Sequence, residues 1–231
     1  MKGLARNHLV WIDALAWEQI EKRAWDSQAQ EILAHWRANS LPLVVCRQRN
    51  ESTPDQICVG LPAPKQWSRR RLALMVSFSS ITVRGVFPTL LQVARANRWG
   101  RTALDFCLAL STSGVNAHVY GSYGWQFLTD LPYLHAESDI DLSLSVNDFD
   151  MARQVLQRLA AAKLHRRIDG EIVFPAGQAI AWRELHQLVA GQTSQVMVKD
   201  RYDIRLAGME EVHKLGHGAQ HGELETSLAL G

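Results

Sequence analysis

The sequence predicts an α+β protein built from two domains. Residues 1–88 read as a small N-terminal α+β domain, because one helical pattern is followed there by short β-branched runs. Residues 89–231 alternate helical and strand patterns, which predicts a mixed sheet flanked by helices. Pro88 falls where the pattern changes. Of the 231 residues, 47% are hydrophobic and 21% are charged, so there is ample apolar material for a core.

In the first half, a short apolar piece at 9–12 precedes a helix that the spacing of its apolar residues predicts over 17–38. β-Branched residues after Pro42 predict a strand over 41–46. The polar segment 47–55 contains Pro54 and reads as a loop, so residues 57–61 become the second strand of a hairpin.

In the second half, Gly114 ends a helix and Asp148 can cap one, while the Pro175-Ala-Gly177 turn predicts a hairpin around it. The expected elements are, in order, a helix at 102–112, a strand at 115–120, a short helix at 121–128, a strand at 138–144, a helix after residue 148, and strands at 166–174, 178–182, 194–199 and 202–206. The Gly- and His-rich tail after Gly216 is expected to be loosely ordered.

Several classes of protein are excluded by composition. The longest apolar stretch, residues 72–91, is broken by Arg84 and Pro88, so no membrane span is expected. Asp13 interrupts the apolar N-terminal piece, which argues against a secretory signal. Three cysteines without C-x-x-C spacing fit reduced thiols in a cytoplasmic protein and exclude a zinc framework.

The net charge of +2 hides an asymmetry along the chain. Residues 102–151 contain no Lys or Arg but seven acids, which leaves sixteen acids against all 25 basic residues elsewhere, a net charge of +9. An acidic segment within an otherwise basic chain is typical of a site for a metal-bound polyphosphate, since carboxylates bind the cations and basic groups bind the phosphates. From charge alone, a solvated acidic face is the simpler explanation.

The spacing of two of these acids favours a metal-binding catalytic site over a solvated surface. Asp139 and Asp141 occupy positions i and i+2 of a predicted strand, so both carboxylates point to one face, where they repel unless a cation lies between them. Hard oxygen ligands suit Mg²⁺ or Mn²⁺. Gly121 and Ser122 follow the preceding strand at a helix start, where backbone N–H groups and the hydroxyl can bind phosphate oxygens. Either motif alone would be unspecific.

Gly121-Ser122 followed by Ser138-Asp-Ile-Asp-Leu142 resembles the signature of the DNA polymerase beta-like nucleotidyltransferase superfamily. The longer string from Gly121 to Leu134, with Ile168-Asp-Gly-Glu-Ile-Val-Phe-Pro175 and Ala181-Trp-Arg-Glu184, is similar to the phosphoribosyl-dephospho-CoA transferases of malonate decarboxylase, also called holo-acyl-carrier-protein synthases. The resemblance covers roughly residues 8–205. The gap between Ser122 and Asp139 is longer than usual for the superfamily, which favours the narrower family.

The resemblance implies that residues 89–231 are a nucleotidyltransferase catalytic domain acting on 2′-(5-triphosphoribosyl)-3′-dephospho-CoA. Its acceptor would be a serine of the acyl carrier protein subunit of malonate decarboxylase, and pyrophosphate would leave. Neither nucleic acid nor a membrane is an expected partner. Two alternatives stay open: another nucleotidyltransferase that uses ATP, and a non-catalytic module that binds a nucleotide or a carrier protein.

A third carboxylate normally completes such a site. Asp169 and Glu171 are again i and i+2, and rank equally as metal ligands beside Asp139 and Asp141, although one of them could instead pair with Arg166 or Arg167. Glu184 is a weaker candidate, since a helix start explains it. Lys199, at the end of a late strand, is a candidate phosphate contact, with an exposed strand end as the alternative.

The N-terminal half is expected either to line the substrate cleft with cations that residues 102–151 lack, or to cover the sheet or dock the carrier protein. Its candidate cations include Arg69–Arg71, for which a solvated turn is the simpler interpretation. The remaining candidates have structural explanations: a core position for Trp125 and Trp182, a buried thiol for Cys107, and a loose tail for His213, His217 and His221.

Overall fold

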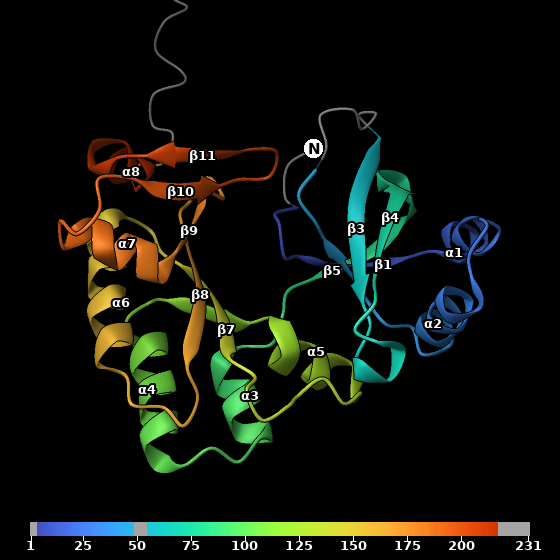
Figure 1. Cartoon of the computed structure of the whole chain (residues 1–231), viewed down its shortest axis with the longest axis horizontal. Helices are drawn as coiled ribbons and strands as arrows, with labels where there is room; N and C mark the ends of the chain where they lie inside the picture. Colours follow the sequence, from blue (N-terminus) through green and yellow to red (C-terminus); the bar gives the residue numbers. More distant parts are fainter. Residues whose placement is uncertain (1–3, 49–54, 217–231) are drawn as a thin grey trace, which may run out of the picture.

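The computed structural model describes residues 4–48 and 55–216, and confirms an α+β fold built on two sheets (Figure 1). The first sheet has the strand order β4-β3-β2-β1-β5, and all of its pairings are antiparallel. Its strands are β1 (Leu9–Ile12), β2 (Leu43–Val45), β3 (Gln56–Pro62), β4 (Arg71–Ser77) and β5 (Ile81–Gly85). Helices α1 (Ala14–Glu21) and α2 (Ser27–Ala38) belong to the same part of the chain.

The second sheet is mixed, as expected, with the order β11-β10-β9-β8-β7-β6. Only the β7–β8 pair is parallel, and the other pairs are antiparallel. Its strands are β6 (Asn116–Val119), β7 (Ile140–Ser145), β8 (Ile168–Val173), β9 (Ala179–Ala181), β10 (Val196–Lys199) and β11 (Ile204–Ala207). The accompanying helices are α3 (Leu90–Ala96), α4 (Arg101–Thr112), α5 (Gly121–Thr129), α6 (Phe149–Ala161), α7 (Trp182–Val189) and α8 (Met209–Leu215).

The predicted helix over residues 17–38 is wrong, because two helices occupy this stretch. Helix α1 ends at Glu21, and α2 begins anew after Asp26, whose carboxylate accepts a hydrogen bond of 3.0 Å from the amide of Ala29. This N-cap satisfies a donor that the start of a new helix leaves without a partner. The indole of Trp25 donates to the carbonyl of Ile20 and closes the turn between the two helices.

Most of the other expected elements are present with shifted ends, including the cap at Asp148, whose carboxylate accepts from the amide of Met151. The prediction missed strands β4 and β5 and helices α3 and α8, and it anticipated α7 only as a helix start at Glu184. Helix α3 begins with a capping box between Thr89 and Gln92, directly after Pro88. The tail after Gly216 and most of the predicted loop over 47–55 lie outside the described residues.

Each sheet has its own hydrophobic core, and α5 joins the two. Trp125 of α5 packs into the core of the first sheet, with its ring 5.4 Å from that of Phe87 and 6.4 Å from that of Trp36. Tyr123, two residues earlier, packs into the core of the second sheet. Figure 1 shows α5 between β7 and α2, so the helix that starts with the Gly-Ser motif is anchored on both sides. No helix in the described part of the chain is long and apolar enough to cross a membrane.

The parallel pair β7–β8 requires a glycine at its centre. Gly170 lies opposite Leu142 and has φ +127°, and a Cβ there would stand 1.9 Å from the carbonyl oxygen of Leu142. The clash is with backbone, so only displacement of a strand could relieve it. The pairing of the two strands that carry the acids therefore depends on the absence of this side chain.

We expect Gly170→Ala to lower the free energy of unfolding by roughly 3 kcal/mol or more, because backbone strain and a steric clash act together. Gly177→Ala is the matched control: it also has positive φ, +88°, but nothing lies within 4 Å of its added Cβ. The control should lose only about 1 kcal/mol. Urea unfolding of both variants measures the difference, and equal losses would contradict a packing role for Gly170.

Candidate active site

Asp139 and Asp141 lie at the start of β7 and point to one face of the second sheet. Ile140 and Leu142, which alternate with them, are fully buried, whereas both acids are partly exposed. The strand pattern that the sequence predicted therefore holds at this point. Asp139 stands just before the first residue of β7, so its side chain lies at the edge of the sheet.

The parallel partner strand contributes a third carboxylate. In the β7–β8 register, Asp169 lies directly opposite Asp141. Because both strands run in the same direction, their first residues meet at one edge of the sheet, and the three aspartates gather there. The side chains of Asp139 and Asp169 are 34% and 39% exposed, so this edge is open to a ligand.

The pKa of Asp141 shows the effect of this gathering. Burial, followed by the charges of Asp169 and Asp139, raises the pKa of Asp141 to about 6, while Arg167 acts in the opposite direction. The repulsion between this carboxylate and its neighbours is relieved when it binds a proton or when a cation lies beside it.

Arg167 is the cation that stands between the aspartates. Its Nε lies 3.4 Å from Oδ2 of Asp139, and a terminal nitrogen lies 3.2 Å from Oδ2 of Asp169. Asp169 is therefore the acid of β8 that pairs with Arg167, and it could bind a cation only if it gave up this ion pair. No group of three or more His, Cys, Asp or Glu side chains among the described residues is arranged to hold a metal ion as the chain stands.

Gly121, the first residue of α5, lies against the carboxylate of Asp141. It has φ +61°, and a Cβ at this position would stand 1.9 Å from Oδ2 of Asp141. The amide of Tyr120, one residue earlier, donates to the carbonyl of Asp141 at 3.0 Å. The N-terminus of α5, including Ser122, is therefore adjacent to the aspartates, as the order of the two motifs predicted.

Glu171 has a different environment from Asp169. Its side chain is only 7% exposed and forms ion pairs with Arg6 and with Lys199, whose Nζ is 3.0 Å from Oε1. Two acids that the sequence ranked equally are thus separated by the structure: Asp169 faces Asp141, and Glu171 is neutralised by two cations. Lys199 lies beside the acids, and its ammonium is bound to one of them.

Sequence reasoning did not single out Arg6 and Tyr120. Arg6 is 165 positions away from Glu171 along the chain, so no local pattern could connect them. Tyr120 directly precedes the Gly-Ser motif. Burial, followed by the negative charges of Glu171, Asp141 and Asp169, raises the pKa of its hydroxyl, while the positive charge of Arg6 lowers it, which places the ring among these groups.

Other candidate residues are engaged elsewhere. Arg70 forms an ion pair with Asp26, and the guanidinium of Arg84 lies over the ring of Phe78. Glu184 accepts from the amide of Met197, which fits the structural role expected at the start of α7. The remaining candidates are explained by packing: Trp125, Trp182 and Cys107 are buried, and the ring of His213 packs on that of Phe149. His217 and His221 lie outside the described residues.

Comparison with known families assigns both parts of the chain. Residues 88–210 match the family model described as phosphoribosyl-dephospho-CoA transferase MdcG C-terminal domain. Residues 5–86 match the corresponding N-terminal domain. No solved structure matches the chain.

Curated relatives agree with these matches. A phosphoribosyl-dephospho-CoA transferase of Xanthomonas axonopodis pv. citri is 35% identical over 206 residues, which cover 87% of this chain and 92% of the relative. One from Bradyrhizobium diazoefficiens is 32% identical over 203 residues, covering 84% of this chain and 85% of the relative. The chain is therefore an enzyme of the transferase class. It belongs to the phosphoribosyl-dephospho-CoA transferase family.

The raised pKa of Asp141 makes a prediction about stability. Its folded-state pKa of about 6 exceeds the ordinary 3.8, so ionisation of Asp141 costs stability as pH rises through this interval. Asp141→Asn removes that cost. Without divalent metal at pH 7.5, the variant should melt roughly 2–4 °C above the wild type, as expected for about 1 kcal/mol in a partly exposed group. Calorimetry at about pH 4, where the advantage should vanish, is the control.

Proposed function

We propose that the protein transfers the phosphoribosyl-dephospho-CoA group from 2′-(5-triphosphoribosyl)-3′-dephospho-CoA to a serine of the acyl carrier protein subunit of malonate decarboxylase. The observation that carries this proposal is the meeting of Asp139, Asp141 and Asp169 at one sheet edge, against the N-terminus of α5. Family membership supports the substrate, and the acidic edge supports phosphoryl-type chemistry.

The donor set at this edge fits Mg²⁺ or Mn²⁺. It consists of carboxylate oxygens only, and the repulsion that raises the pKa of Asp141 is what a divalent cation would relieve. Asp139, Asp141 and Asp169 would hold the ion, and Glu171 is the alternative if its ion pairs open. When bound, a divalent cation offsets phosphate charge and lowers the pKa of the acceptor hydroxyl.

In the proposed reaction, the serine oxygen forms a bond to the α-phosphorus, and the bond from that phosphorus to the β-phosphate bridging oxygen breaks. Pyrophosphate leaves with the bonding electrons, and the serine proton passes to a carboxylate of the site. The amides at the start of α5 and the hydroxyl of Ser122 would bind the departing phosphates, since a helix N-terminus attracts anions. The ammonium of Lys199 adds a positive charge beside them.

The N-terminal part of the chain would contribute to the same site through Arg6. The guanidinium of Arg6 reaches Glu171 and acts on Tyr120, next to the aspartates. Residues 102–151 lack Lys and Arg, so Arg6 would supply positive charge for the substrate phosphates that the acidic stretch does not contain. Arg70 is less suitable, because it forms an ion pair with Asp26.

We also propose a cytoplasmic location. Cys46 and Cys107 are free thiols, and burial raises the pKa of Cys107 to about 11, which keeps it protonated and unreactive. Such thiols suit a reducing compartment.

Replacement of the aspartates tests the reaction. We expect Asp139→Asn and Asp141→Asn each to reduce transfer by roughly 10³-fold or more, because one donor for the cation is lost while the fold is kept. Asp150→Asn is the matched control, since this residue is highly exposed on α6. Transfer is measured as the mass added to the carrier protein. Wild-type transfer by either aspartate variant would contradict the assignment of the active site. A carrier protein that gains the mass of a nucleoside monophosphate would favour the alternative that uses ATP.

Replacement of Arg6 tests the N-terminal contribution. Arg6→Gln should raise the KM for the triphosphate substrate by roughly tenfold, because a charged contact to the phosphates is lost. Its control is Arg69→Gln, an exposed arginine of the N-terminal half, which should leave KM unchanged. If Arg6→Gln lowers only the melting temperature and not the substrate affinity, Arg6 serves to hold the two parts of the chain together.

A further inference from the structure

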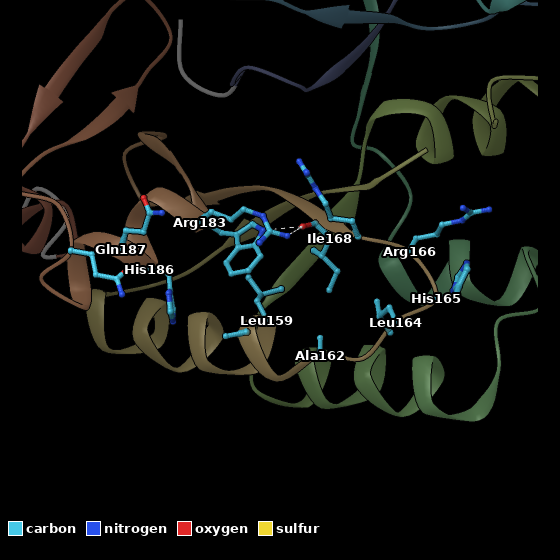
Figure 2. Close-up of a pocket in the computed structure, with 13 residues that line it drawn as sticks. Leu159, Ala162, Leu164, His165, Arg166, Ile168, Arg183, His186 and Gln187 are labelled. Carbon is cyan, nitrogen blue, oxygen red and sulfur yellow. Dashed lines mark hydrogen bonds between the residues drawn. The ribbon is translucent and has the colours of Figure 1, made fainter. Parts of the chain in front are cut away.

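A pocket of about 610 Å³ lies beside the start of β8, which carries Asp169 as its second residue (Figure 2). It is an open pocket bordered by the C-terminal end of α6, the segment 162–167, the first residue of β8 and helix α7. This volume is within the range of small-molecule sites, roughly 300–1,000 Å³. Asp139, Asp141, Asp169 and Glu171 do not line the pocket, so it is a second space next to the proposed reaction centre.

The pocket is basic. Its thirteen lining residues include no Asp or Glu, but they include Arg166, Arg167 and Arg183 together with His165 and His186. The charge is thus opposite to that of the neighbouring carboxylates. Such a lining attracts an anion that needs no metal for binding.

Two of the three guanidinium groups are held in place by the backbone. Arg183 donates to the carbonyl of Ile168 at 3.0 Å, the contact drawn as a dashed line in Figure 2, and its Cζ lies 4.4 Å from the ring centre of Trp182. Arg166 donates to the carbonyl of Ala136. A guanidinium has five N–H donors, so both groups keep donors for a ligand, and their planar fork suits phosphate oxygens.

Arg167 connects the pocket with the aspartates. It lines the pocket, and the same guanidinium spans Asp139 and Asp169. A ligand that begins at the carboxylates can therefore continue past Arg167 into the basic pocket. Two adjacent sites of opposite charge suit a ligand with two separate anionic groups, one bound with a cation and one bound by arginines.

We propose that this pocket binds the nucleoside diphosphate portion of the dephospho-CoA group. The inference rests on the proposed function, whose substrate carries a triphosphate at its reacting end and a diphosphate in its dephospho-CoA part. Arg183 binds the diphosphate beside Ile168, and His186 borders the nucleoside, while Arg166, whose side chain points away from Arg183 in Figure 2, adds positive charge at the other end of the pocket. Trp182 is 5% exposed and covered by Arg183, so it positions that arginine and does not stack on the base.

Binding of dephospho-CoA to the full chain, measured by titration calorimetry with a chelator in place of divalent metal, tests this proposal. Dephospho-CoA lacks the triphosphate, so it reports on the pocket alone. The double variant Arg166→Gln/Arg183→Gln should bind it roughly tenfold more weakly or worse, because contacts to charged groups are lost. ADP should compete for the same site, and inorganic pyrophosphate should compete much less well.

Arg153→Gln is the matched control, because it removes one positive charge from α6 outside the pocket. It should keep wild-type affinity. Circular dichroism establishes that each variant is folded. Equal affinity of the double variant and the wild type, or no measurable binding by the wild type, would overturn the proposal. If pyrophosphate competes as well as ADP does, the pocket does not recognise the nucleoside, and that part of the proposal is wrong. Failure of the proposed function would be seen in a different experiment, in which Asp139→Asn or Asp141→Asn keeps wild-type transfer.

Discussion

Repulsion among three carboxylates at the shared edge of β7 and β8 determines what surrounds them. The parallel register sets Asp169 opposite Asp141, and the charges of its neighbours help to raise the pKa of Asp141. Arg167 offsets part of this repulsion. The glycine at the start of α5 leaves room for the crowded carboxylate, because any side chain at Gly121 would collide with it. A site that is electrostatically unfavourable when empty is one that gains from binding a cation.

The two parts of the chain are joined at this same place. Arg6 reaches Glu171 across the largest separation in sequence, and Trp125 of α5 fills the N-terminal core. A buried carboxylate such as Glu171 is costly unless it is paired, so its two cations hold strands β8 and β10 and the N-terminal segment in one arrangement. The N-terminal half is thus coupled to the site by charge and by packing, and its placement has consequences for the chemistry.

Charge is divided around the sheet edge in a way that matches a long, doubly anionic substrate. Carboxylates lie on one side, and a pocket without acids lies on the other, with Arg167 between them. Each side suits a phosphate group, but by different means: the first through a cation and the second through arginines. Specificity for a coenzyme-like group would then depend on the pocket, and reactivity on the aspartates.

The sequence by itself determined the fold class, the strand that carries Asp139 and Asp141, and the neighbouring Gly121-Ser122 motif, because alternation along a strand and a glycine at a tight turn are local properties. The predicted helix ran past its true end, because the apolar spacing continues across the break even though the cap at Asp26 is itself a local signal. Only the tertiary structure gave Asp169 and Glu171 different surroundings. Both acids share a face of β8, and what distinguishes them is the register with β7 and an arginine 165 positions away, neither of which a local pattern can encode.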